Sequence, residues 1–322
     1  MSMEQAIRDF PKQFAFEPEI TNEAALPGAT RGVVVCGMGG SALTPDLLMA
    51  WDPAGDLRVY RGYGLPDLSD IDDRLIIASS YSGNTEETLD AYDVARDKGL
   101  AVAAIATGGE LLARAERDGV PYVQLPSTGI QPRMALGYSM RALVALMRHE
   151  RASDQLRALT GTVDATTWGD AGRMLAEELR DRTPIVYASD RNGAIARCWK
   201  IAMNETGKVP AFANTFPELN HNEMTGFDAG SGAPSFIERF HIVLLRDAED
   251  DPRIQKRMDV AAELFRDRGL QVTDVAFDGE ERLTRIFNSI ILGSWTALHL
   301  ASAYGAESEL VPMVEEFKRR IA

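Results

Sequence analysis

The sequence is poor in cysteine, with only two thiols, Cys36 and Cys198, among 322 residues. Both lie in strongly patterned segments, which favours reduced thiols in a cytoplasm over a disulfide scaffold. No N-terminal stretch combines basic and apolar regions as a signal peptide does. We therefore expect a cytoplasmic protein.

Basic residues are also scarce. Lys and Arg number 34 against 48 Asp and Glu, which gives a formal net charge of −14. This balance argues against a nucleic-acid partner, because such a protein needs a basic face. An anionic substrate is compatible with the charge if its site is locally positive, built from helix N-termini and a few placed arginines.

Long apolar runs are missing as well. None reaches the roughly 18–20 residues of a membrane-spanning helix, so we expect no membrane partner. Short apolar runs instead alternate with amphipathic helical segments, which predicts parallel sheets covered by helices on both faces. The expected strands are 31–37, 56–60, 74–80, 100–106, 121–126, 183–189, 239–246 and 270–277.

This alternation occurs twice, and a mostly helical stretch lies between the two parts. We expect an α/β fold with two domains, residues 1–150 and residues 151–322, each a doubly wound, flavodoxin-like parallel sheet flanked by helices. Pro11 should disturb a short N-terminal helix. The expected terminal helices are 3–14, 281–303 and 309–321.

Two loops rich in glycine and hydroxyl groups follow strands of the first half: GMGGSA at 37–42 and SSYSGNTEET at 79–88. Both loops lie where parallel sheets bind ligands, and each leads into a helix N-terminus with free N–H groups. Hydroxyls and N–H groups can bond the terminal oxygens of a phosphate monoester without a lysine. The residues expected to bind phosphate are Gly39, Gly40, Ser41, Ser80, Ser82 and Thr85.

The first loop also fits the dinucleotide-binding pattern G-x-G-x-x-A through Gly37, Gly39 and Ala42. Such a site favours an acid at the end of the second strand, where this chain has Tyr60 and Arg61. Alternatively, the glycines serve only a tight turn between strand and helix. A dinucleotide enzyme stays open as a weaker alternative, which NADH binding would test.

The loops SYSGNTEET and GMGGSA strongly resemble those of the sugar isomerase (SIS) domain, which binds phosphosugars. Two such units in tandem resemble phosphoglucose isomerases. The segment NETGKVPAFANTFPELNHNEMTGF, at 204–227, closely resembles the corresponding part of the bifunctional phosphoglucose/phosphomannose isomerases of archaea and bacteria, and QPRMALGYS at 131–139 agrees with it. The resemblance covers nearly the whole chain and implies tandem SIS domains.

The resemblance implies three catalytic residues. Glu205, in the last turn of a helix with Gly207 as the expected C-cap, matches the base that moves a proton between C1 and C2. His221 matches the histidine assigned to ring opening, which an imidazole can perform near neutral pH. Arg133 matches the arginine that stabilises the enediolate, and its guanidinium stays charged and offers several donors.

One feature departs from the family pattern, which commonly carries a basic residue, often lysine, on a C-terminal helix that reaches the substrate. Residues 291–305 contain no lysine, and His299 is the nearest basic candidate for a substrate contact. Core packing is the alternative role for His299. The sequence has no H-E-x-x-H motif or Cys/His cluster, so we expect neither a metal nor another cofactor.

The expected activity is the interconversion of glucose 6-phosphate or mannose 6-phosphate with fructose 6-phosphate through a cis-enediol. The resemblance also implies a homodimer in which the catalytic histidine reaches the active site of the neighbouring subunit. The alternatives are a non-catalytic sugar-phosphate-binding SIS protein and an isomerase of another phosphosugar. Retention of Glu205, His221 and Arg133 together argues against the non-catalytic alternative, because binding alone needs none of them.

Overall fold

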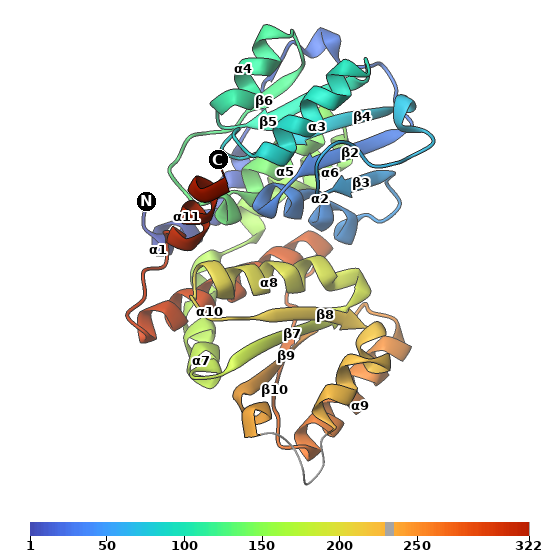
Figure 1. The fold of residues 1–322 in the computed structure, drawn as a ribbon. Helices are drawn as coiled ribbons and strands as arrows, with labels where there is room; N and C mark the ends of the chain where they lie inside the picture. The colour runs from blue at the N-terminus through green and yellow to red at the C-terminus, as the bar shows by residue number, and fades with distance from the viewer. Residues whose placement is uncertain (229–234, 322) are drawn as a thin grey trace. The chain divides into compact units, whose positions relative to one another are not determined.

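In the computed structural model, which describes residues 1–228 and 235–321, the chain divides into two compact units (Figure 1). The first unit comprises Met1 and Arg8–Asp164, and the second comprises Ser2–Ile7 and Ala165–Ala322. Residues 151–164, expected in the second domain, fall in the first unit. They do so because their helix packs on the preceding one, where Arg141 donates a hydrogen bond to the Ser153 carbonyl across 2.7 Å.

The first unit contains a six-stranded sheet with the order β1-β6-β5-β4-β2-β3. Its five longer strands run parallel, as the alternation predicts, and β1 is an additional antiparallel edge strand of two residues. Two residues are too few to produce a recognisable pattern, so β1 was not predicted. The strands are β1 (Ile20–Thr21), β2 (Gly32–Gly37), β3 (Leu57–Tyr60), β4 (Arg74–Ser79), β5 (Ala101–Ala106) and β6 (Tyr122–Gln124).

Helices cover both faces of this sheet (Figure 1). Side chains of β2 and β4, such as Val34 and Ile76, form one side of the core with Tyr92 of α3 and Leu111 of α4. Helices α2 and α5 cover the opposite face, and α6 packs against α5. The helices are α2 (Gly39–Trp51), α3 (Glu86–Asp97), α4 (Gly109–Arg117), α5 (Leu136–Leu146) and α6 (Glu150–Thr162).

The second unit contains a four-stranded parallel sheet with the order β10-β9-β7-β8. Three of its strands match the predicted ones, but β8 was missed. Its sequence, FANTF, mixes apolar and polar residues and carries no continuous apolar run. The strands are β7 (Thr183–Ser189), β8 (Phe212–Phe216), β9 (Phe240–Arg246) and β10 (Gln271–Ala276).

The helices of the second unit also lie on both faces of its sheet, with α9 on one face and α7, α8 and α10 on the other (Figure 1). The single N-terminal helix expected at 3–14 is in fact two elements, α1 and the 3₁₀ helix η1 (Phe10–Ala15), and Pro11 lies in the first turn of η1. The α-helices are α1 (Met3–Arg8), α7 (Gly169–Leu179), α8 (Gly193–Glu205), α9 (Pro252–Asp267), α10 (Arg282–Ala303) and α11 (Pro312–Ile321).

Helix α10 is long and apolar enough to cross a membrane, which corrects the expectation that no run has that length. However, 78% of its apolar window is buried within the protein. A Cβ on Gly172 of α7 would lie 2.6 Å from the Trp295 Cβ, and one on Gly293 would lie 2.8 Å from the Trp199 ring of α8. These glycines let α7 and α8 approach α10 closely, which is the packing of a core helix.

Candidate active site

In the first unit, the two hydroxyl-rich loops meet at the carboxyl ends of β2 and β4, which are neighbours in the sheet. The Tyr81 N–H donates a hydrogen bond to the Ser41 hydroxyl across 3.1 Å. A Cβ on Gly37 would lie only 2.7 Å from the Ser79 carbonyl oxygen, so this approach requires glycine. The structure therefore brings Ser41 together with the 79–88 loop, as predicted for a common site.

Within the 79–88 loop, the Ser80 hydroxyl serves the loop itself. Its oxygen accepts hydrogen bonds from the N–H groups of Gly83 (3.1 Å) and Thr85 (3.4 Å), and it lies 2.8 Å from the Thr85 hydroxyl. Ser80 therefore bonds within its own loop, and either of the two hydroxyls can donate in the contact between Ser80 and Thr85. Ser80 is 1% exposed, whereas Ser82 is exposed and Thr85 is half-buried.

The start of α2 lies against the segment that carries Arg133. Gly39 has a left-handed backbone (φ +50°). A Cβ on Gly40 would lie 2.7 Å from the Pro132 carbonyl oxygen and 3.2 Å from the Arg133 nitrogen, so any side chain there would displace the segment. The buried Arg133 is thus anchored beside a helix N-terminus, which attracts anions.

A buried glutamine, Gln13, which was not predicted to be important, binds the residues that follow Arg133 in the same segment. Gln13 donates from Nε2 to the Met134 carbonyl (2.6 Å) and accepts at Oε1 from the Gly137 N–H (3.1 Å). The motif QPRMALGYS therefore includes a glycine, Gly137, whose N–H donates a hydrogen bond to a side chain far away in the sequence. No local pattern marks Gln13, because its partner Met134 lies 121 residues further along the chain.

In the second unit, Glu205 is the last residue of α8, as predicted. The expected C-cap role of Gly207 is wrong, because the C-cap of α8 is Thr206 and the left-handed residue that follows is Lys208 (φ +57°). Gly207 is instead required for close packing, since a Cβ there would lie 2.8 Å from the Met203 carbonyl oxygen. The Lys208 ammonium donates a hydrogen bond to the Glu205 carbonyl across 2.7 Å and thereby stabilises the end of α8.

His221 ends the 3₁₀ turn η7 (Glu218–His221), which follows β8. Its side chain is exposed, whereas Leu219, two residues earlier, is fully buried. The imidazole therefore projects from a segment that is itself attached to the core, and it is accessible to another molecule.

His299, the candidate for a substrate contact, has partners inside its own unit. Its Nε2 lies 3.1 Å from the Gly169 carbonyl oxygen at the start of α7, so this nitrogen carries the proton and donates it. Its ring stacks on Trp295, with the ring centroids 5.8 Å apart and an interplanar angle of 21°. These contacts favour the alternative role of His299, the packing of α10 against α7.

The last helix of the chain is α11, and it carries a lysine. Lys318 is exposed on this helix and forms an ion pair with Glu315 at 2.9 Å. The prediction considered residues 291–305, which form the end of α10 and the turn after it, and did not consider Lys318 of α11. The signal was present in the sequence, because a helix is predicted at 309–321.

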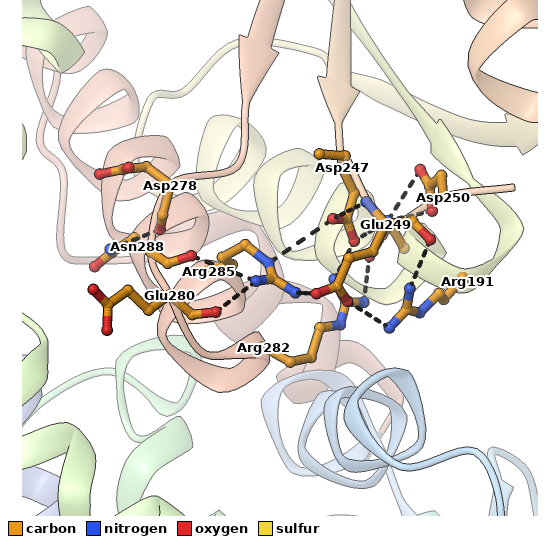
Figure 2. Close-up of polar contacts among 12 residues, drawn as sticks. Arg191, Asp247, Glu249, Asp250, Asp278, Glu280, Arg282, Arg285 and Asn288 are labelled. Atoms are coloured by element: carbon orange, nitrogen blue, oxygen red, sulfur yellow. Dashed lines mark hydrogen bonds and ion pairs between the residues drawn. The ribbon is translucent and has the colours of Figure 1, made fainter. Parts of the chain in front are cut away.

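The corresponding strand ends of the second unit carry mainly charged side chains (Figure 2). Asp247, after β9, has no exposed side-chain surface, and Arg282 of α10 donates to it across 2.5 Å. Arg282 also donates to the Asn192 side-chain oxygen (2.5 Å), and the Ser189 hydroxyl donates to Asp250 (2.7 Å). Because Asp247 already pairs with this arginine, the arrangement favours the first unit as the phosphate-binding unit.

This charged cluster is buried strongly enough to change proton affinities. Burial lowers the pKa of Arg282 to about 10, although Asp247 acts in the opposite direction. Burial raises the pKa of Asp250, and its hydrogen bond with Ser189 partly offsets that effect. The cluster therefore depends on mutual pairing, as buried ions do.

Replacing Arg282 by methionine is expected to lower the free energy of unfolding by about 3–5 kcal/mol, because Asp247 becomes a buried charge without its main partner. Urea denaturation of the variant would measure the loss. The matched control is Arg253→Met, which removes an exposed arginine paired with Asp251 and should change stability little. Equal stabilities of the two variants would contradict a structural role for the buried pair.

The two cysteines are both buried free thiols, as predicted. Burial raises the pKa of the Cys36 thiol to about 12, so the thiolate is not formed near neutral pH. Over residues 1–228 and 235–321, no group of three or more His, Cys, Asp or Glu side chains is arranged to hold a metal ion.

Comparisons with known proteins identify related sequences. The family described as bacterial phospho-glucose isomerase C-terminal SIS domain matches residues 170–321. The chain is 37% identical to a bifunctional phosphoglucose/phosphomannose isomerase of Caldicellulosiruptor bescii, over 90% of this chain and 89% of that protein. It is 30% identical to a D-glucosamine-6-phosphate 4-epimerase of Sulfolobus acidocaldarius, over 69% of this chain and 72% of that protein.

Solved structures share the fold at lower sequence identity. Tagatose-6-phosphate ketose/aldose isomerase from Escherichia coli is 19% identical with a TM-score of 0.68, and the match covers 94% of this chain and 93% of that one. The C-terminal domain of glucosamine-fructose-6-phosphate aminotransferase from Francisella tularensis is 14% identical with a TM-score of 0.69, covering 96% and 98%. The fold is thus that of tandem SIS domains, and the full-length sequence similarity shows that the chain belongs to the family of bifunctional phosphoglucose/phosphomannose isomerases.

Proposed function

We propose that this protein is an aldose–ketose isomerase that interconverts glucose 6-phosphate and mannose 6-phosphate with fructose 6-phosphate. The observation that carries the proposal is the 37% identity, over 90% of the chain, to a bifunctional phosphoglucose/phosphomannose isomerase. The candidate base Glu205 at the end of α8 and the hydroxyl-rich loops of the first unit support it. The protein acts in the cytoplasm and requires no cofactor.

The chemistry is a rearrangement within the sugar. After His221 assists opening of the ring, Glu205 removes the C2 proton. The C–H electron pair forms the C1–C2 double bond while the π pair of the C1 carbonyl moves onto O1, which takes up a proton to give the cis-enediol. Arg133 stabilises the negative charge that develops on oxygen. Glu205 then returns the proton to C1 while the C2 hydroxyl becomes the ketone, so that no external oxidant is needed.

One enediol serves both aldoses. Glucose 6-phosphate and mannose 6-phosphate differ only in configuration at C2, and that carbon is planar in the enediol. In the reverse direction, protonation of C2 from one face or the other gives one epimer or the other. A site that does not discriminate between the two faces therefore converts both sugars.

The phosphate group of the substrate binds in the first unit. Ser82 and Thr85 present accessible hydroxyls, and Ser41 joins the two loops through its bond with Tyr81. The N-termini of α2 and α3 add N–H groups and partial positive charge. Ser80 belongs to the same site but acts by shaping the 79–88 loop around its own hydroxyl.

The double substitution Ser82→Ala and Thr85→Ala is expected to raise KM by roughly tenfold or more, because hydrogen bonds to a charged group are lost. The turnover number kcat should change much less, since the phosphate is remote from C1 and C2 and is held alike in the ground and transition states. Steady-state kinetics with fructose 6-phosphate would measure both constants. Thr160→Ala removes an exposed hydroxyl from α6 as the control, and an unchanged KM in the double variant would remove these hydroxyls from the site.

The subunit arrangement is part of the proposal. The protein forms a homodimer with shared active sites, to which the exposed His221 is contributed by the neighbouring chain. Lys318 of α11 replaces His299 as the candidate C-terminal basic residue for a substrate contact, because Lys318 is exposed whereas His299 packs between Gly169 and Trp295.

A second candidate function is suggested by the similarity to the D-glucosamine-6-phosphate 4-epimerase. Incubation of the purified protein with fructose 6-phosphate, followed by separate assays for glucose 6-phosphate and mannose 6-phosphate, tests the main proposal. Formation of both aldoses supports bifunctional isomerisation. Conversion of glucosamine 6-phosphate alone would contradict it and favour the epimerase.

A further inference from the structure

The segment that carries His221 is attached to the sheet of the second unit by one carboxylate. The Tyr187 hydroxyl, from β7, donates a hydrogen bond to Glu223 Oε1 across 2.6 Å. The Asn214 side-chain amide, from β8, donates to the other oxygen of the same carboxylate. Glu223 therefore ties the segment to two adjacent strands through both of its oxygens.

Apolar anchors hold the same segment on either side of the histidine. Leu219 is fully buried and Phe227 is 8% exposed, and both belong to the core of the second unit. His221 lies two residues after Leu219 and two residues before Glu223. The imidazole is thus the exposed midpoint between a hydrophobic anchor and a hydrogen-bonded one.

The Tyr187 hydroxyl is held in its protonated, donating form. Burial raises the pKa of Tyr187, and its hydrogen bond to Glu223 raises the pKa further. The phenol therefore remains a neutral donor, and because Tyr187 is 0% exposed its hydroxyl needs an acceptor within the protein. A change at Glu223 would leave this buried hydroxyl without its partner.

We infer that Glu223 is a positioning residue for His221, acting through Tyr187 and Asn214; this inference rests on the proposed function, in which His221 opens the sugar ring. Without the carboxylate, the apolar Leu219 and Phe227 still anchor the segment, but its two bonds to β7 and β8 are lost and the imidazole can leave its productive orientation. A displacement of about 1 Å at a catalytic group is enough to reduce turnover roughly 100-fold.

The kinetic test compares three variants. In Glu223→Ala, kcat should fall by roughly 100-fold with little change in KM, because the phosphate site lies in the other unit. In Glu223→Gln, an oxygen still accepts from Tyr187 while the bond from Asn214 is lost, so the fall should be about tenfold. Glu218→Ala is the matched control, because its exposed carboxylate bonds only to Asn222 among the contacts that the structure describes, within the same segment.

A spectroscopic test is independent of activity. The chain has only four histidines, so imidazole NMR signals can be resolved, and His221→Ala assigns the signal of interest. We expect the His221 signal to shift in Glu223→Gln and in Tyr187→Phe, while the signals of the other histidines stay in place. An unchanged His221 signal in both variants, or an unchanged kcat in Glu223→Ala, would overturn the inference. If the wild-type protein is inactive but the His221 signal still shifts in Glu223→Gln and Tyr187→Phe, the proposed function is overturned and the positioning role remains supported.

Discussion

Replacing Glu205 by glutamine is expected to lower the isomerisation rate by roughly 10²- to 10⁴-fold, the range that a positioned general base contributes. The amide retains the shape of the carboxylate but cannot accept the C2 proton. Substrate binding should remain close to that of the wild type, because the substituted group acts only on the reacting carbons. The variant should therefore lose kcat while its KM changes little.

Exchange of the C2 proton with solvent gives the most direct measurement. In deuterated water, the wild-type protein should incorporate deuterium at C2 of glucose 6-phosphate, and Glu205→Gln should not. Glu177→Gln provides the control, since Glu177 lies in the last turn of α7 in the same unit and is exposed. Substantial exchange by Glu205→Gln would mean that another group is the base.

The end of helix α8, around Glu205, could be predicted from the sequence only in part. The end of α8 at Glu205 was predictable, because a helical pattern runs into glycine there. The way in which the helix ends differs from the prediction, since Lys208 rather than Gly207 adopts the left-handed conformation. Gly207 is needed because the chain turns back against the Met203 carbonyl, and such a contact leaves no local signal.

The parallel sheets were predictable for a physical reason. Strands buried on both faces produce continuous apolar runs such as Val33-Val34-Val35-Cys36, which stand out from the helices between them. The mixed sequence of β8 gives no such run, because three of its five residues are only half-buried. That strand is nevertheless central to the site, since it provides Asn214 and leads directly to the His221 segment.

The meeting of the two hydroxyl-rich loops at one sheet edge was predictable, but the different contacts of their hydroxyls were not. Ser80, Ser82 and Thr85 are similar in sequence terms, and only the folded loop shows that the Ser80 oxygen accepts two N–H groups. The same holds for Asp247, which follows β9 in the second unit, because its contacts could not be predicted from the sequence. Asp247 resembles a surface residue until its pairing with the buried Arg282 is seen.

Mixing two inactive variants is expected to restore activity if the active sites are shared between subunits. The variants are Glu205→Gln and His221→Ala, each inactive alone through the loss of a different catalytic group. In a mixed dimer, one site combines the intact glutamate of one chain with the intact histidine of the other, and the second site carries both lesions. Random exchange of equal amounts makes half of the dimers mixed, so about a quarter of all sites should work.

The exposure of His221 motivates this expectation, because an imidazole that projects from its own unit is available to a neighbouring chain. Activity should appear with the rate of subunit exchange, which labelled chains would report independently. Mixing Glu205→Gln with a chain that carries both substitutions is the control and should restore nothing. If exchange is complete and the two single variants remain inactive together, each site is built from one chain, and the proposal of shared active sites fails.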